Sequence, residues 1–309
     1  MSEIKKKILE FAEYKDNWNE NGASSFSKKV IKNALELEKY LYIGDNIIPD
    51  IFPTACDSLQ IEYEDNNKYL EIEIKKDKYG IYKKINGIES EFYLGLDKVY
   101  EIINIIKLFY KPNIDSAILF TGAFNPPTVA HFHMIESANN AYNFDYIIFA
   151  ISNQKFLDKK QRKTGDYAYS EKERLKMILA MTYKESNVLV FGVEEGYTYQ
   201  VLCAVKEKYK CKSLFFALGS DKLSEIGRWG YHDKLLTEIC FYILQREDNL
   251  SYIKEKCDKL FSKTKYIIGK DNEKYKNISA TLVRKRIKDN KDYKELVTES
   301  VFKVIKSKK

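Results

Sequence analysis

The chain has 309 residues, 44% of them hydrophobic, so it is long enough to bury one large core or two ordinary ones. Its 52 lysines and arginines outnumber 45 aspartates and glutamates, giving a formal net charge of +7 at pH 7. The basic residues are interspersed with acidic ones and no nucleic-acid-binding motif is present, which argues against a nucleic acid as partner. A modest positive charge would instead favour small anionic ligands.

Targeting and metal-binding patterns are absent from the sequence. No apolar run reaches the length of a membrane-spanning helix, and the N-terminal stretch lacks the apolar core and cleavage site of a signal peptide. We therefore expect a cytoplasmic protein with no membrane partner. The five cysteines are scattered without CxxC spacing, and no His or Cys cluster has the spacing of a zinc site. We accordingly expect reduced core cysteines and no metal held by the protein alone.

Residues 1–95 differ in pattern from the rest. After a polar opening that contains WNENGASSF, apolar residues recur at helical spacing over 27–42, and the period then changes to two around Leu59 and Leu70. This order predicts a small α+β domain with antiparallel strands. Its Trp-x-x-x-Gly-Ala opening resembles that of a module found in varied bacterial proteins. No catalytic spacing is present, so we predict a regulatory, interaction or oligomerisation role, with ligand sensing as an equal alternative.

A helical segment over 96–113 is expected to connect this domain to the next, and Pro112 ends it. From residue 114 to 309, short apolar runs alternate with helical patterns; the expected strands are 117–120, 146–151, 188–191, 214–218, 240–244 and 266–268. Such alternation predicts an α/β domain with a mostly parallel sheet covered on both faces. Ligands of these sheets bind at the carboxyl ends of the strands.

The stretch TGAFNPPTVAHFHMI, residues 121–135, follows the first of these strands and leads into a helix. Gly122 lets the backbone approach a ligand, and Thr128 and its successors open a helix whose first N–H groups have no partner within it. Such a helix start suits phosphate. The glycines match neither a Walker loop nor GxGxxG. We expect a functional role for His131 in this turn, and a structural one for His133.

A second element, ISATLVRKRI at residues 278–287, also has the features of a helix start that suits phosphate. Ser279 is a candidate N-cap, Thr281 adds a hydroxyl in the first turn, and Arg284 presents a planar fork of donors. This combination predicts a second socket for phosphate.

These two elements resemble motifs of a known protein superfamily. GAFNPPTVAH resembles the GxFxPxxxGH signature of the nucleotidyltransferase superfamily, whose conserved element is HxGH or TxGH, and ISATLVR resembles its ISSTxxR motif. The resemblance implies a Rossmann-like domain. It also implies a catalytic set of His131, Thr128 and Arg284, and an ATP-binding set of Gly122, Ala123, Phe124, His131, Ser279, Thr281 and Arg284. Thr121, Ala130 and Ala280 depart from the usual family residues.

Four further stretches resemble the branch of this superfamily that makes NAD or its deamido form, namely nicotinate or nicotinamide mononucleotide adenylyltransferases. They are SEKERLKMILAM (170–181), GYTYQVL (196–202), LGSDKLSEIGRW (218–229) and LVTESVFKVI (296–305). The resemblance implies that Tyr197, Thr198, Asp221 and Trp229 bind the acceptor, where aromatic planes suit a pyridine ring. Helix capping by Asp221 and a core position for Trp229 stay open as alternatives.

The resemblance implies transfer of the adenylyl group of ATP to nicotinate or nicotinamide mononucleotide, with Mg²⁺ entering with ATP. ATP and a pyridine mononucleotide are then the partners, and a homo-oligomer is compatible with the sequence. Two alternatives remain: adenylyl or cytidylyl transfer to another phosphorylated acceptor, such as pantetheine phosphate, FMN or glycerol phosphate, and a nucleotide sensor without turnover. The family departures at Thr121, Ala130 and Ala280 leave the sensor open.

Overall fold

The computed structural model describes residues 1–43, 48–155, 157–158, 167–193, 197–246, 249–270 and 273–307. The chain divides into two compact units, one of residues 1–112 and 183–186 and the other of residues 113–182 and 187–309. The helix expected to connect the domains is grouped with the first unit. Within the described ranges, no helix combines the length and apolar character that crossing a bilayer requires.

The first unit pairs an antiparallel sheet with helices. Its strands neighbour one another in chain order: β1 (Asp50–Pro53), β2 (Leu59–Asp65), β3 (Lys68–Ile74), β4 (Lys78–Ile85) and β5 (Ile88–Gly95). As the two-residue period predicted, alternate side chains of β2 and β3 are buried. Helices α2 (Lys28–Glu38) and α3 (Val99–Tyr110) pack on β3. The first helix, α1 (Glu3–Phe11), was not predicted, because its lysines separate the apolar residues that it buries.

The WNENGA segment of this unit forms a turn held by its own side chains. Asn17 Oδ1 accepts a hydrogen bond from the Gly22 N–H at 2.7 Å, and Trp18 Nε1 donates to the Ser24 carbonyl at 3.1 Å. Gly22 has φ +80°, a conformation that favours glycine. The Trp18 ring packs 6.1 Å from that of Phe26. Local structure therefore accounts for the residue types of this motif.

The second unit is built on a six-stranded parallel sheet in the order β11-β10-β9-β6-β7-β8. The strands are β6 (Ser116–Gly122), β7 (Tyr146–Ile151), β8 (Val188–Gly192), β9 (Ser213–Gly219), β10 (Cys240–Gln245) and β11 (Tyr266–Lys270). All six expected strands are present, and their parallel pairing confirms the predicted fold class. Since β6 lies beside β9 and the chain winds outward to both edges, the switch point of the fold falls between them.

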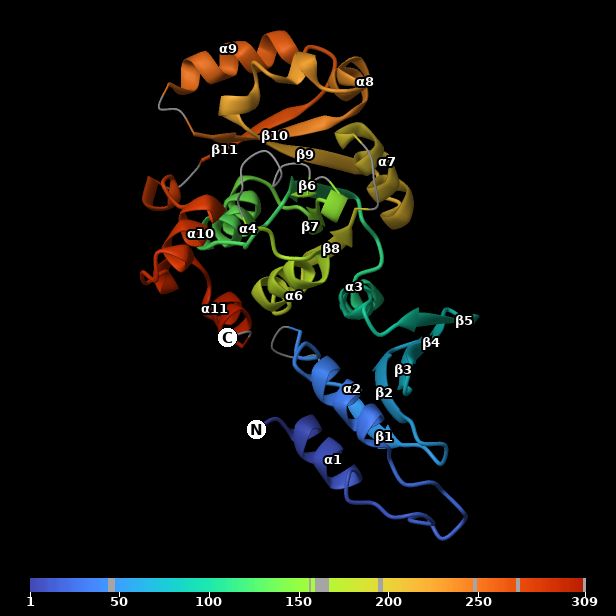
Figure 1. The fold of residues 1–309 in the computed structure, drawn as a ribbon. Coiled ribbons are helices and arrows are strands. Elements are labelled where there is room, and N and C mark those ends of the chain that lie inside the picture. Colours follow the sequence, from blue (N-terminus) through green and yellow to red (C-terminus); the bar gives the residue numbers. More distant parts are fainter. Residues whose placement is uncertain are drawn as a thin grey trace. The chain divides into compact units, whose positions relative to one another are not determined.

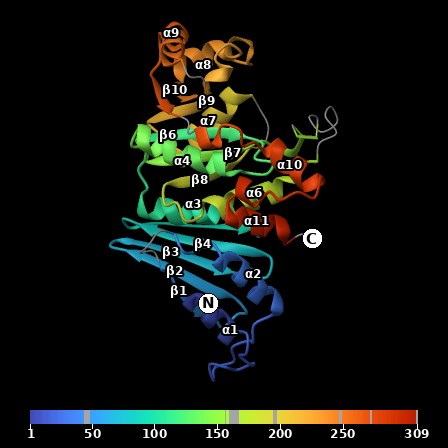
Figure 2. The ribbon, with the colours of Figure 1, turned by 90° about the vertical axis from the view of Figure 1, so that its left-hand side faces the viewer.

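Helices cover both faces of this sheet (Figure 1). On one side lie α4 (Val129–Ala141), α6 (Glu171–Thr182) and α11 (Glu299–Lys306), and on the other α7 (Thr198–Tyr209), α8 (His232–Glu238) and α9 (Leu250–Leu260). The C-terminal α11 packs on α6, as the turned view also shows (Figure 2). A further helix, α10 (Ala280–Lys288), begins within the second predicted phosphate-binding element.

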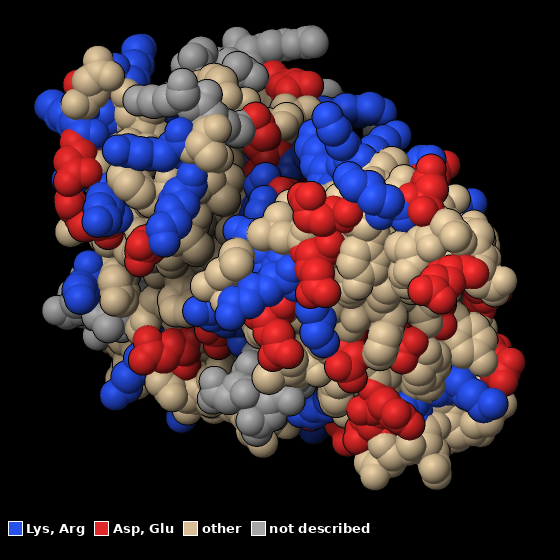
Figure 3. Space-filling view, turned by 90° about the horizontal axis from the view of Figure 1, so that it is seen from below, with Lys and Arg blue, Asp and Glu red and all other residues tan. Residues whose placement is uncertain are grey.

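Charge is mixed on one face of the molecule. Lysine and arginine side chains alternate with aspartate and glutamate on the face drawn in Figure 3. Several pairs lie one helical turn apart, such as Lys259 with Glu255 at 2.7 Å and Lys303 with Glu299 at 2.9 Å. Exposed pairs of this kind contribute about 0–1 kcal/mol each, so they affect solubility more than stability.

A buried hydroxyl network fixes α4 on the sheet. Ser137 Oγ lies 2.9 Å from Tyr242 Oη and donates to the Lys270 carbonyl at 2.8 Å. Tyr242 is fully buried on β10, and its hydroxyl passes directly over Gly269 of β11. A Cβ at Gly269 would lie 1.8 Å from that hydroxyl oxygen, so only glycine fits. The network sets the position of α4, the helix that begins with the TVAH element.

Replacing Gly269 with alanine should therefore destabilise the second unit. Because the new methyl overlaps a buried ring, we expect the free energy of unfolding to fall by about 1–3 kcal/mol. Chemical denaturation measures this, with Gly227→Ala as the control, since a Cβ at Gly227 meets no heavy atom within 4 Å. Equal midpoints for the two variants would contradict the steric argument.

Candidate active site

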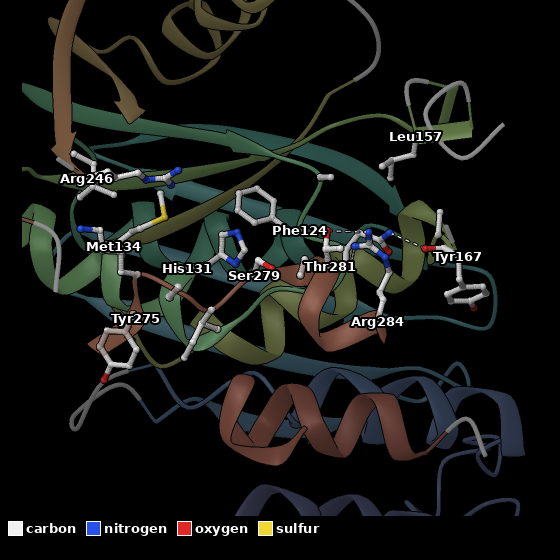
Figure 4. A pocket seen from close by; sticks show the side chains of 18 residues that line it. Phe124, His131, Met134, Leu157, Tyr167, Arg246, Tyr275, Ser279, Thr281 and Arg284 are labelled. Atoms are coloured by element: carbon white, nitrogen blue, oxygen red, sulfur yellow. Dashed lines mark hydrogen bonds between the residues drawn. The ribbon is translucent and has the colours of Figure 1, made fainter. Parts of the chain in front are cut away.

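A cavity of about 360 Å³ lies at the carboxyl ends of the strands, where both predicted phosphate-binding elements meet (Figure 4). Its walls come from the loop after β6, the first turns of α4, the end of β10 and residues 275–284 around the start of α10. His131 stands in the middle, with Met134 and Tyr275 toward one end and Thr281 and Arg284 toward the other. The fold thus joins the two elements in one site.

Thr128 holds the His131 ring through contacts to its Nδ1 nitrogen. The Thr128 backbone N–H donates to His131 Nδ1 at 3.0 Å, and Thr128 Oγ1 lies 2.8 Å from the same nitrogen. Because Nδ1 accepts that N–H, a neutral ring carries its proton on Nε2. The Phe124 ring supports the imidazole edge-to-face at 5.1 Å. The opposite edge of His131 therefore presents one N–H donor to the cavity.

The charge state of this ring is set by its surroundings. Burial, with a smaller contribution from the positive charge of Arg246, lowers the pKa of His131 to about 4. The imidazole is consequently neutral at physiological pH. A neutral donor can bond a phosphate oxygen without adding a further cation to a site that already holds arginines.

A titration should reveal this low pKa. Histidine in an unfolded chain titrates near 6.5, so between about pH 4 and 6.5 the unfolded state binds more protons than the folded state. The contribution of His131 to stability is thus full above about pH 6.5 and is lost as the pH falls toward 4. Side-chain NMR of the three histidines, with His131→Ala assigning its signal, measures the midpoint. A midpoint near 6.5 in the folded protein would contradict the lowered pKa of His131.

Arg284 connects the two elements directly. Its Nη1 donates to the Asn125 carbonyl at 2.8 Å, across 159 positions of sequence, and its Nη2 donates to Thr281 Oγ1 at 3.2 Å. Ser279 caps α10 by accepting from the Leu282 N–H at 3.2 Å. Ser279, Thr281 and Arg284 all line the cavity. The start of α10 therefore adds a fixed cation and helix N–H groups to the wall that faces α4.

Asn125 joins three segments around the cavity. While its carbonyl accepts from Arg284, its side-chain Oδ1 accepts from the Tyr169 N–H at 2.9 Å and its Nδ2 donates to the Tyr167 carbonyl at 3.1 Å. The residue is 5% exposed. The predicted signature contains this asparagine, but no role was predicted for it, because its partners lie far away in sequence.

Gly122 and Thr128 were both predicted to contact phosphate. Neither lines the cavity. A Cβ at Gly122 would lie 3.0 Å from the ring of Phe124, which itself has φ +43°, so the glycine makes room for that ring. The Thr128 side chain is fully buried and faces His131. Both residues therefore act on the cavity through Phe124 and His131, whereas Ala123 and Phe124 line it as expected.

Arg246 lines the cavity although it was not predicted as a site residue. It directly follows β10, and its Nη1 lies 3.4 Å from Asp221 Oδ1. A residue just after a strand of a parallel sheet lies at the ligand-binding edge, which is the signal that would have found it.

Arg174 acts from behind the cavity wall. It is fully buried, and its Nη1 donates to the Ala123 carbonyl at 2.9 Å while its Nη2 lies 3.5 Å from Gln154 Oε1. Burial lowers the pKa of Arg174 to about 10, which still leaves the guanidinium charged at neutral pH. It thus fixes the loop after β6 and places a positive charge beside it.

The four residues predicted to bind the acceptor lie outside the lining of this cavity. Tyr197 and Thr198 begin α7, while Asp221 and Trp229 lie in the segment after β9. Asp221 pairs with the cavity residue Arg246, and the Tyr197 ring lies against the residue next to Trp229. Asp221 is therefore linked to the cavity through Arg246, and Tyr197 lies close to Trp229 through Gly230. Gly196 of the same motif lies outside the described residues.

Comparison with known proteins gives a consistent result. The family model described as cytidylyltransferase-like matches residues 119–286, from within β6 to within α10. A probable nicotinate-nucleotide adenylyltransferase of Clostridium botulinum (strain Loch Maree / Type A3) is 29% identical over 195 residues, which are 62% of this chain and 96% of the relative. One of Fusobacterium nucleatum is 28% identical over 196 residues, covering 60% and 95%.

The fold also matches a solved structure, Plasmodium falciparum nicotinic acid mononucleotide adenylyltransferase complexed with NaAD. The TM-score is 0.50 at 20% sequence identity, and the match covers 63% of this chain and 96% of the other. The same enzyme complexed with APC gives the same values. At this identity the likeness establishes a common fold.

Proposed function

This chain belongs to the cytidylyltransferase-like family, and we propose that it transfers the adenylyl group of ATP to the 5′-phosphate of nicotinate mononucleotide or its amide. The observation that carries the proposal is the arrangement around His131. A neutral ring with its Nε2–H toward a cavity faces a wall that bears Arg284 and the start of α10. Two helix starts and two arginines around one cavity are suited to a triphosphate.

The proposed step is a single displacement. An oxygen of the acceptor's 5′-phosphate bonds to the α-phosphorus of ATP while the bond from that phosphorus to the bridging oxygen breaks, and pyrophosphate leaves with the bonding electrons. Because no covalent enzyme intermediate is required, the protein contributes positioning and stabilisation of charge. His131 would donate to an α-phosphate oxygen, and Arg284 with Ser279 and Thr281 would hold the outer phosphates.

We expect Mg²⁺ to enter with the nucleotide. Among the residues that the structure describes, no aspartate or glutamate lines the cavity, and no group of three His, Cys, Asp or Glu residues is placed to hold a metal. Mg²⁺ on the phosphate oxygens would neutralise charge on the leaving pyrophosphate. Arg284 and Arg246 would then orient the nucleotide from the protein side.

A pyridine mononucleotide is the acceptor that the remaining observations favour. Tyr197 and Trp229 would offer aromatic planes for its ring, and the Asp221 carboxylate would accept from ribose hydroxyls. The names of the relatives support the same acceptor. Synthesis of the NAD precursor is therefore the proposed physiological role.

The direct test measures pyrophosphate release by the purified chain with ATP and Mg²⁺. We expect turnover with nicotinate or nicotinamide mononucleotide and none without an acceptor, because hydrolysis of ATP is not the proposed reaction. His131→Ala should lower the rate by a factor of about 10² to 10³, which also excludes a contaminating enzyme.

Parallel reactions with CTP, pantetheine phosphate, FMN and glycerol phosphate separate the alternatives. Turnover with one of these, and no turnover with either pyridine mononucleotide, would show that the proposed acceptor is wrong. Binding of ATP without turnover on any acceptor would identify a sensor and reject the enzymatic proposal.

Truncation of Arg284 should weaken ATP binding specifically. Loss of charge-assisted hydrogen bonds to the outer phosphates is expected to raise the KM for ATP by about 10- to 100-fold. Arg286→Ala is the matched control, since Arg286 lies on the same helix, donates to the Asp292 carbonyl at 2.9 Å and does not line the cavity. Similar KM values for the two variants would argue against the assignment of Arg284.

A further inference from the structure

The segment between Trp229 and α8 has an unusual backbone. Gly230 follows the tryptophan, and Tyr231 then adopts a left-handed conformation with φ +61° as the residue that precedes α8. Non-glycine residues seldom take this conformation. Here it turns the chain sharply between a predicted acceptor residue and a helix, and it brings the Tyr231 ring to the start of α7.

The ring of Tyr197 occupies the space that a side chain at position 230 would need. A Cβ on Gly230 would lie 2.5 Å from Tyr197 Cδ1, 2.8 Å from Cε1 and 2.9 Å from Cγ. Cγ is the ring atom nearest the backbone, so a flexing of the ring tip would not relieve the overlap. Any larger residue at 230 must turn the whole Tyr197 ring away.

Other contacts define where the ring lies. Tyr231 stands edge-to-face with it at 5.6 Å and 73°, and Tyr199 lies 5.7 Å beyond Tyr231. The backbone of Tyr197 is fixed as well, because its N–H donates to Gln200 Oε1 at 2.9 Å. Even so, Tyr197 is 60% exposed. The Tyr197 ring therefore packs against Gly230 and Tyr231, while much of its surface stays accessible to solvent.

We propose that Gly230 is a positioning residue for the acceptor: by leaving room for the Tyr197 ring, it sets the aromatic surface against which the pyridine ring of the mononucleotide stacks. This inference rests on the proposed function. Gly230 acts only through Tyr197 and touches no substrate itself. Since neither residue lines the cavity around His131, the effect is confined to the acceptor and does not extend to ATP.

The experiment compares Gly230→Ala with Gly227→Ala in steady-state kinetics with ATP and the pyridine mononucleotide. A Cβ at Gly227 meets no heavy atom within 4 Å, so this variant controls for a glycine replacement three residues earlier in the chain. We expect Gly230→Ala to raise the KM for the mononucleotide about tenfold, the size of one lost stacking contact, with the KM for ATP unchanged. Gly227→Ala should match the wild type.

Tyr197 variants test whether the effect passes through the ring. Tyr197→Ala should raise the KM for the mononucleotide as much as Gly230→Ala does, and the double variant should show no further rise, because both changes remove the same contact. Tyr197→Phe keeps the ring and should raise the KM less than Tyr197→Ala does. These variants also test the proposal if Gly230→Ala does not fold, since Tyr197 is exposed.

The outcomes separate this inference from the proposed function. No turnover of the wild-type chain with either mononucleotide overturns both. Turnover with equal KM values for Gly230→Ala and Gly227→Ala overturns the positioning role alone. A parallel rise in the KM for ATP, or additive effects in the double variant, also overturns it, because a general structural defect would then explain the loss.

Discussion

The architecture of the candidate site depends on the loop that follows β6, and Asn125 is the residue that holds this loop to its surroundings. Its carbonyl binds Arg284 of α10, and its side-chain amide binds the backbone on either side of residue 168. A buried side chain that satisfies both its donor and its acceptor specifies one arrangement, because any other would leave polar groups unpaired. The two helix starts that could bind phosphate are thereby fixed on opposite walls of a single cavity.

Positive charge gathers at this site. Arg174 is fully buried behind the loop, Arg284 and Arg246 stand at the cavity, and Arg246 also pairs with Asp221. Burial and the positive charge of Arg246 lower the pKa of His131, so the imidazole stays neutral and adds no further cation. A polyanionic ligand would interact favourably with these guanidinium groups. Perturbed pKa values such as those of His131 and Arg174 cluster at functional sites.

The two units differ in how far local residue patterns account for them. In the first unit, alternating strands and the WNENGA turn are explained by burial and by short-range hydrogen bonds. In the second unit, several residues have their type because of distant partners: Gly269 lies under the Tyr242 hydroxyl and Gly230 under the Tyr197 ring. These glycines are required by close approach of a side chain, with no special backbone conformation involved. The regulatory or interaction role of the first unit stays a prediction.

The sequence by itself determined the strands of the parallel sheet, because buried strands appear as continuous apolar runs. It also predicted two phosphate-binding elements, because helix starts have a local residue signature. His131 and Arg284, predicted from these elements, line one cavity in the structure. Only the tertiary structure decided that Thr128 supports the imidazole ring, that Gly122 accommodates Phe124, and that Arg246 joins the site. The physical reason is the separation along the chain over which each interaction acts. Periodicity and capping act within a few residues of each other, whereas close packing and buried hydrogen bonds join residues that the fold alone brings together.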